Sequence, residues 1–176
     1  MSEITDNYNF IIEHLRRFNQ NLKIIFTLSP VRYVKDGCHI NQLSKSTLLL
    51  AIDNIINSSR DCFYFPSYEI LLDDLRDYRF YNDDLVHPND FAVNYIFDKF
   101  SECFFKNETK VINKSVNDLN NMLNHRPFNT NSNDYRLFLK KTNEKILSLC
   151  EKYPFLDLRD ENQIIKNKIK LLDKMS

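Results

Sequence analysis

The sequence predicts an α/β fold in its first part, followed by a mostly helical region. Two short runs rich in β-branched and aromatic residues, at 23–28 and 62–65, end at proline-containing turns and are typical of buried strands. A helical pattern at 44–57 lies between them. Strand, helix and strand in this order indicate a βαβ unit with two parallel strands. No similar strand pattern follows Pro66.

The elements before Pro66 are predicted from hydrophobic spacing and from turn residues. Residues 3–20 are expected to form a helix because apolar side chains recur at helical spacing and neither Pro nor Gly interrupts them. The first strand ends at Ser29-Pro30, and the polar stretch 31–37 is expected to be a loop. The second strand ends at Pro66 itself.

The rest of the chain is predicted to be helical or looped. We expect two regions, with residues 1–107 forming the α/β part and residues 108–176 a helical extension packed on it. The expected helices cover residues 68–77, 89–105, 108–124, 135–152 and 160–173. The first of them is short and acidic, the second is amphipathic and the third is long and polar.

Composition excludes several classes of protein. The 176 residues carry 24 basic and 24 acidic side chains. A net charge of zero argues against a broad nucleic-acid-binding face, which needs clustered Lys and Arg. No apolar stretch approaches about 20 residues, so no membrane span is expected. The polar, acidic N-terminus lacks the chemistry of a signal peptide, so we expect a cytoplasmic protein that binds neither nucleic acid nor membranes.

Glycine and cysteine usage excludes further sites. Gly37 is the only glycine, whereas a dinucleotide-binding loop, a P-loop and a G-x-S-x-G elbow each need two or more at fixed spacing. The four cysteines lie far apart without C-x-x-C spacing, which indicates neither a zinc ribbon nor a disulfide framework. We expect reduced, mostly buried cysteines, no metal site and no cofactor.

The predicted sheet is too small to be complete. Two strands alone would both be edges with unpaired main-chain groups, and parallel sheets are usually wider. We therefore expect the chain to be part of a larger α/β domain. Self-association through an exposed edge strand is a related expectation.

The stretch 82–89 carries the candidate catalytic pair. Loops at the carboxyl ends of parallel strands gather at one edge of the sheet, where ligands bind. Asp84 and His87 are three residues apart, so the carboxylate can accept from Nδ1–H of the imidazole and leave Nε2 as a general base. Pro88 biases His87 away from helical geometry, and Asn89 is a suitable N-cap. A helix-entry turn in which the His packs locally is the alternative.

The loop after the first strand contains weaker candidates. Arg32 is a candidate contact for an anionic or carbonyl group of a substrate, and a solvated loop charge is the alternative. Ser29 is interpreted as a strand terminator because Pro30 follows it and no helix N-terminus stands behind it.

Several blocks of the sequence resemble the GSCFA family, which is related to the SGNH, or GDSL-like, esterases. The blocks occur in the right order and span nearly the whole chain. They are residues 26–32 (FTLSPVR), 35–37 (KDG), 64–70 (YFPSYEI), 74–81 (DLRDYRFY), 84–88 (DLVHP), 125–128 (HRPF) and 153–157 (YPFLD).

The resemblance implies a fold, an activity and roles for particular residues. The fold would be the C-terminal part of an SGNH-hydrolase-like, flavodoxin-like three-layer parallel-sheet domain. The activity would be that of an ester (acyl) hydrolase, with Asp84 as the orienting acid and His87 as the general base. Arg32 and Tyr33 would bind a substrate such as an acyl ester or an acetylated carbohydrate, although Tyr33 stands where the family is expected to have a His.

The block that gives the family its name and its nucleophile, Gly-Ser-Cys-Phe-Ala, does not occur in these 176 residues. The resemblance therefore implies a partial or truncated hydrolase that is inactive alone, with the missing N-terminal half supplied elsewhere. The alternative is a non-catalytic remnant, or a binding module that uses the helical C-terminal region.

Overall fold

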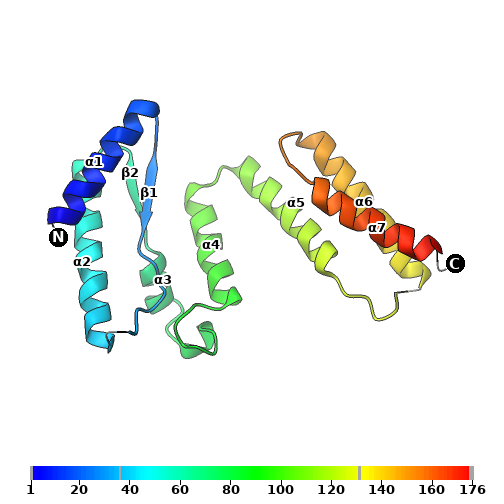
Figure 1. Cartoon of the computed structure of the whole chain (residues 1–176), viewed down its shortest axis with the longest axis horizontal. Helices are drawn as coiled ribbons and strands as arrows, with labels where there is room; N and C mark the ends of the chain where they lie inside the picture. Colours follow the sequence, from blue (N-terminus) through cyan, green and yellow to red (C-terminus); the bar gives the residue numbers. More distant parts are fainter. Residues whose placement is uncertain (1, 36, 131, 175–176) are drawn as a thin grey trace. The chain divides into compact units, whose positions relative to one another are not determined.

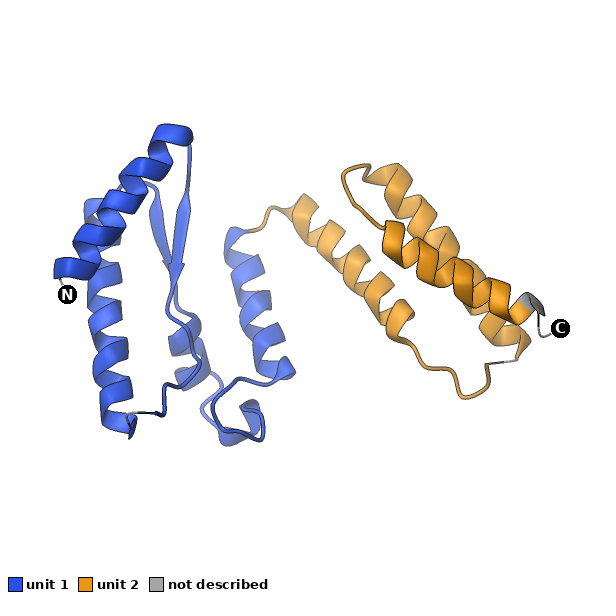
Figure 2. Cartoon of the chain, in the orientation of Figure 1, with its two compact units in different colours: residues 1–104 blue, residues 105–176 orange. Residues whose placement is uncertain are grey.

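The computed structural model describes residues 2–35, 37–130 and 132–174. The chain divides into two compact units, residues 1–104 and 105–176 (Figure 2). The first unit combines helices with a parallel sheet, and the described part of the second unit is built from helices (Figure 1). The predicted α/β fold followed by a helical region is therefore confirmed. Asp36, which belongs to one of the family-like blocks, lies outside the described residues.

The helices and strands follow one another along the chain with short connections. The first unit contains α1 (Ser2–Phe18), β1 (Ile24–Thr27), α2 (Gly37–Ser58), β2 (Cys62–Phe65), α3 (Ser67–Asp73), the 3₁₀ helix η1 (Tyr78–Phe80) and α4 (Asp90–Phe104). The second unit contains α5 (Asn107–Asn124), α6 (Asn133–Lys152) and α7 (Arg159–Lys174).

Strands β1 and β2 are parallel, as predicted, with Ile24 opposite Cys62. Successive side chains of a strand point to opposite faces of a sheet. Cys62 packs with Ile55 of α2 on one face, whereas the Phe65 ring contacts Phe100 of α4 on the other. Helices therefore cover both faces of the sheet. The carboxyl ends of both strands lie at the same end of the sheet (Figure 1).

Two helix bounds differ from the prediction by more than two residues. Helix α2 begins at Gly37 and not at residue 44, because residues 37–43 contain no proline and Gly37 adopts a φ of 87°, which glycine tolerates at a helix start. Helix α3 ends at Asp73 and not at residue 77. The carboxylate of Asp77 instead accepts from the N–H of Arg79 and begins η1.

The second unit has its own hydrophobic core. Leu119 of α5, Ile146 of α6 and Ile165 of α7 are buried together. An ion pair between Lys145 and Asp118, 3.5 Å apart, joins α6 to α5 at the surface. No helix in the described ranges is long and apolar enough to span a membrane.

The cysteines are free, but the expectation that most of them are buried is wrong. Cys62 is buried in the sheet and Cys150 is half-buried. Cys38 and Cys103 are exposed. Cys38 lies on the first turn of α2 and Cys103 on the last turn of α4.

Candidate active site

The turn that carries Asp84 and His87 is closed by main-chain hydrogen bonds. Tyr81 and Pro88 form an isolated antiparallel bridge. Between these two residues, the N–H of Asn82 donates to the carbonyl oxygen of His87 over 2.8 Å. These contacts hold the two ends of the turn together.

Asn89 connects this turn to helix α4. Its side-chain amide donates to the carbonyl oxygen of Arg79 over 2.7 Å. Its Oδ1 accepts from the N–H of Ala92 over 3.1 Å, which confirms the predicted N-cap. One side chain thus bonds to η1 and to α4, and it fixes the turn between them.

Asp84 accepts three hydrogen bonds within the turn. Its Oδ1 accepts from the N–H of Val86 over 2.8 Å and from that of His87 over 3.0 Å, and its Oδ2 lies 2.7 Å from Nδ1 of His87. The N–H and the ring of His87, followed by the N–H of Val86, lower the pKa of Asp84 to about 2. The carboxylate is therefore ionised at neutral pH and orients the imidazole.

The other edge of the imidazole faces solvent. The side chain of His87 is 57% exposed and that of Asp84 is 47% exposed. Within the described part of the chain, Nε2 of His87 has no hydrogen-bond partner. With Nδ1 beside the carboxylate, Nε2 is the nitrogen that can accept a proton from another group.

Arg32 joins the loop after β1 to this turn. Its main-chain N–H donates to the carbonyl oxygen of Val86 over 3.2 Å, and its guanidinium donates to that of Leu85 over 3.3 Å. Leu85 adopts a φ of 55°, a left-handed conformation that is unfavourable for a residue with a branched side chain. Arg32 therefore binds the turn at the residue with the strained backbone.

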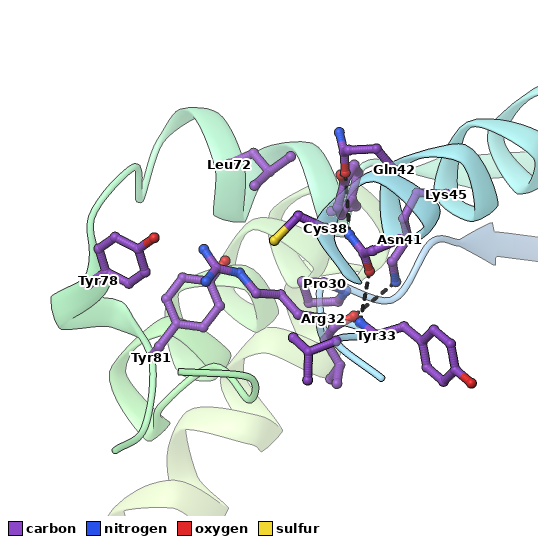
Figure 3. A pocket seen from close by; sticks show the side chains of 13 residues that line it. Pro30, Arg32, Tyr33, Cys38, Asn41, Gln42, Lys45, Leu72, Tyr78 and Tyr81 are labelled. Atoms are coloured by element: carbon purple, nitrogen blue, oxygen red, sulfur yellow. Dashed lines mark hydrogen bonds between the residues drawn. The ribbon is translucent and has the colours of Figure 1, made fainter. Parts of the chain in front are cut away.

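The guanidinium of Arg32 lies over two tyrosine rings, 4.2 Å from the ring centroid of Tyr81 and 5.1 Å from that of Tyr78 (Figure 3). These cation–π contacts fix its position. Tyr33 is placed differently. Its N–H donates to Oδ1 of Asn41 over 2.8 Å, and its exposed ring extends away from Arg32.

A cavity of about 280 Å³ lies next to the loop after β1 (Figure 3). Its other walls are the first turns of α2, helix α3 and the segment around η1. Arg32, Tyr33 and Lys45 are among its lining residues. Neither Asp84 nor His87 is among the described residues that line it. The structure therefore brings Asp84 and His87 together and attaches Arg32 to their turn, while the cavity is a neighbouring feature.

Sequence reasoning did not identify Lys45 as a residue of this region. Lys45 is buried, and its ammonium donates to the carbonyl oxygens of Ser29 and Val31 over 2.6 and 2.9 Å. Tyr68 also lines the cavity, and its hydroxyl donates to Oε1 of Gln42 over 2.6 Å. One sequence signal was present, since Lys45 is the only Lys, Arg, Asp or Glu in residues 37–52.

The remaining sequence candidates make local contacts. The hydroxyl of Ser29 accepts from the N–H of Val31 over 3.2 Å, a contact within the loop. Across the described ranges, no group of three or more His, Cys, Asp or Glu side chains is placed to hold a metal ion.

Comparison with known proteins gives two matches to one family. Residues 1–100 match the GSCFA family, and residues 116–171 match the C-terminal domain of GSCFA domain proteins. The first match covers more than half of the chain and includes Arg32 and the turn with Asp84 and His87. No curated protein and no solved structure matches the chain.

Proposed function

Because the chain belongs to the GSCFA family, we propose that its first unit supplies the acid–base pair of an SGNH-type ester hydrolase. Asp84 is the orienting acid and His87 is the general base. The observation that carries this proposal is the 2.7 Å contact between Oδ2 of Asp84 and Nδ1 of His87, which leaves Nε2 exposed.

The proposed chemistry needs a serine from a segment outside these 176 residues. Nε2 of His87 removes the hydroxyl proton as the serine oxygen attacks the acyl carbon. The imidazolium then protonates the leaving alkoxide, and a water activated by the same nitrogen releases the acid. Asp84 stays ionised throughout because its pKa is low, and it stabilises the imidazolium.

Arg32 and Tyr33 are the proposed substrate contacts, and an acyl ester such as an acetylated carbohydrate is the proposed substrate. Arg32 supports this role through its position, since it lines the cavity and also bonds to the turn beside His87. Tyr33 lines the same cavity from the loop after β1.

We place the missing serine on an additional α/β segment that pairs with the edge of the sheet. In the described part of the chain the sheet has two strands, so each strand has an edge with unpaired N–H and C=O groups. Large apolar side chains of the first unit, among them Phe10 and Phe18 of α1 and Phe63 of β2, are exposed and offer a surface for such a segment. Self-association through the same edge is the competing use of this surface.

The test is an esterase assay on the chain co-expressed with a polypeptide that carries the Gly-Ser-Cys-Phe-Ala block. p-Nitrophenyl acetate is the substrate, and His87→Ala is expected to lower kcat/KM by about three orders of magnitude. His125→Ala is the matched control, because His125 is an exposed residue of the other compact unit. Equal turnover by the two variants contradicts the proposal.

A binding module is the second candidate. The helices α6 and α7 expose four large aliphatic side chains, which are Leu137, Leu147, Ile164 and Leu171. This candidate assigns these side chains to a surface that binds a partner. This candidate predicts that no combination of polypeptides hydrolyses the ester.

A further inference from the structure

The cavity beside Arg32 has a positive lining. Arg32 and Lys45 both line it, and none of its described lining residues is Asp or Glu. Neither cation forms an ion pair within the described part of the chain. Lys45 is only 8% exposed, so water screens its charge weakly. An anion that enters the cavity therefore meets two positive charges that no carboxylate of the described lining residues neutralises.

Both cations retain hydrogen-bond donors. The ammonium of Lys45 has three N–H groups, of which two are engaged by the carbonyl oxygens of Ser29 and Val31. The guanidinium of Arg32 has five N–H groups, and it donates one to the carbonyl oxygen of Leu85. The remaining donors of Arg32 have the planar geometry that binds a carboxylate through two parallel hydrogen bonds.

The start of helix α2 adds to the positive potential in the cavity. Cys38 and Asn41 line the cavity and lie within the first turns of a 22-residue helix. The N-terminus of a helix carries a partial positive charge that favours anions nearby. This contribution strengthens the effect of Arg32 and Lys45, which are the principal charges.

The other walls are apolar and aromatic. Tyr78, Tyr81 and Leu72 line the cavity (Figure 3). Tyr68 and Val31 are among its other lining residues. A volume of about 280 Å³ lies at the lower end of the range of roughly 300–1,000 Å³ for small-molecule sites. The cavity therefore suits a small molecule with an apolar body and one anionic group.

We infer that this cavity binds a small organic carboxylate with an aromatic or branched aliphatic body. The carboxylate lies between Arg32 and Lys45, and the body lies against the tyrosine rings. The inference rests on the proposed function in one respect, because it makes the natural ligand the acid that is released from an ester whose acyl group is larger than acetyl. Binding itself needs no serine and no turnover.

Two exposed cysteines allow a direct test in the unmodified chain. Cys38 lines the cavity, whereas Cys103 lies on α4 and is not among the described lining residues. The chain is treated with iodoacetamide with and without benzoate, and mass spectrometry measures the alkylation rate of each thiol. At a benzoate concentration about ten times Kd, the rate at Cys38 is expected to fall about tenfold, by mass action. The rate at Cys103 is expected to stay constant.

A neutral ligand and an inorganic anion test whether the cavity recognises both the charge and the apolar body of benzoate. Benzamide has the shape of benzoate without its charge, and it is expected to leave the Cys38 rate unchanged. Inorganic phosphate has charge without an apolar body, and it is expected to protect Cys38 much less than benzoate does. Equal protection by benzamide or by phosphate overturns the assignment, and so does a Cys38 rate that benzoate does not change.

Variants of two arginines test whether Arg32 supplies the positive charge that binds the carboxylate. Arg32→Gln is expected to raise the Kd for benzoate about tenfold or more, as measured by the same protection experiment. Arg60→Gln is the matched control, because the side chain of Arg60 is 92% exposed and pairs with Asp61 away from the cavity. Equal Kd values for the two variants contradict the role of Arg32. These readouts involve no ester hydrolysis, so their failure is distinguishable from that of the proposed acid–base pair.

Discussion

Replacing Lys45 by Met tests whether the buried ammonium holds the loop after β1 in place. Lys45 donates to the carbonyl oxygens of Ser29 and Val31, which flank Pro30 just before Arg32. Met keeps the unbranched aliphatic part of the side chain and can fill most of its volume. The substitution therefore removes mainly two hydrogen bonds from a charged donor.

The expected loss of stability follows from these two contacts and two offsets. A hydrogen bond to a charged group contributes about 1.5–3 kcal/mol, so two set an upper limit of about 3–6 kcal/mol. Burial lowers the pKa of Lys45, which means that its ammonium loses hydration on folding and that Met avoids this cost. Ser29 is exposed, so water can also hydrate part of the freed loop. We expect a net decrease of about 2 kcal/mol in the free energy of local unfolding.

Hydrogen exchange measured by mass spectrometry resolves this effect in the full chain. A change of about 2 kcal/mol corresponds to roughly 30-fold faster exchange in peptides that cover the loop before α2. Peptides from residues 105–176 belong to the other compact unit and provide an internal reference. Lys23→Met is the matched control, because Lys23 is exposed in the same unit. If Lys45→Met and Lys23→Met exchange at the same rate in this loop, the reasoning about Lys45 is refuted.

Three further predictions concern the turn and the second unit. Nitrogen NMR is expected to show neutral His87 mainly as the Nδ1–H tautomer, because Oδ2 of Asp84 accepts from Nδ1; an unchanged tautomer ratio in Asp84→Asn contradicts this role. The pKa of Asp84 is lowered from 3.8 to about 2, so its stabilising effect is complete above about pH 4 and is lost as the pH falls through about 2. The protection of the Val86 amide against exchange, relative to its intrinsic rate at each pH, is therefore expected to fall in this window in the wild type but not in Asp84→Asn, and equal pH profiles of protection argue against it. Ile146→Ala in the core of the second unit is expected to lower the free energy of unfolding by about 2–5 kcal/mol in urea titrations followed by circular dichroism, whereas the exposed Leu147→Ala is expected to cost less than about 1 kcal/mol.

The strands and most helices could be predicted because their signals are local. The run at 62–65 is short, aromatic and bounded by Pro66, and β2 covers these residues. The start of α2 could not be predicted in the same way. A lone glycine usually indicates a turn, whereas Gly37 uses its positive φ to begin the helix directly.

The contact between Asp84 and His87 was predictable because it also depends on local geometry. A spacing of three residues before a proline allows the side chains to meet within one turn. The cavity was not predictable, because Lys45 and Tyr68 come from separate helices that meet only through packing around the sheet. The one available signal was Lys45 as the single Lys, Arg, Asp or Glu in residues 37–52, and it does not show where the side chain lies.

The direction of the His87 imidazole depends on more than its own turn. Leu85 lies between the two members of the pair in a left-handed conformation, which costs roughly 1–2 kcal/mol relative to ordinary backbone. The carboxylate of Asp84 compensates from inside the turn, since it binds two main-chain N–H groups. Arg32 compensates from outside, since it binds the carbonyl oxygens of Leu85 and Val86. Because Arg32 is itself held by two tyrosine rings of the cavity wall, the loop after β1 and the turn before α4 act as one support for Nε2.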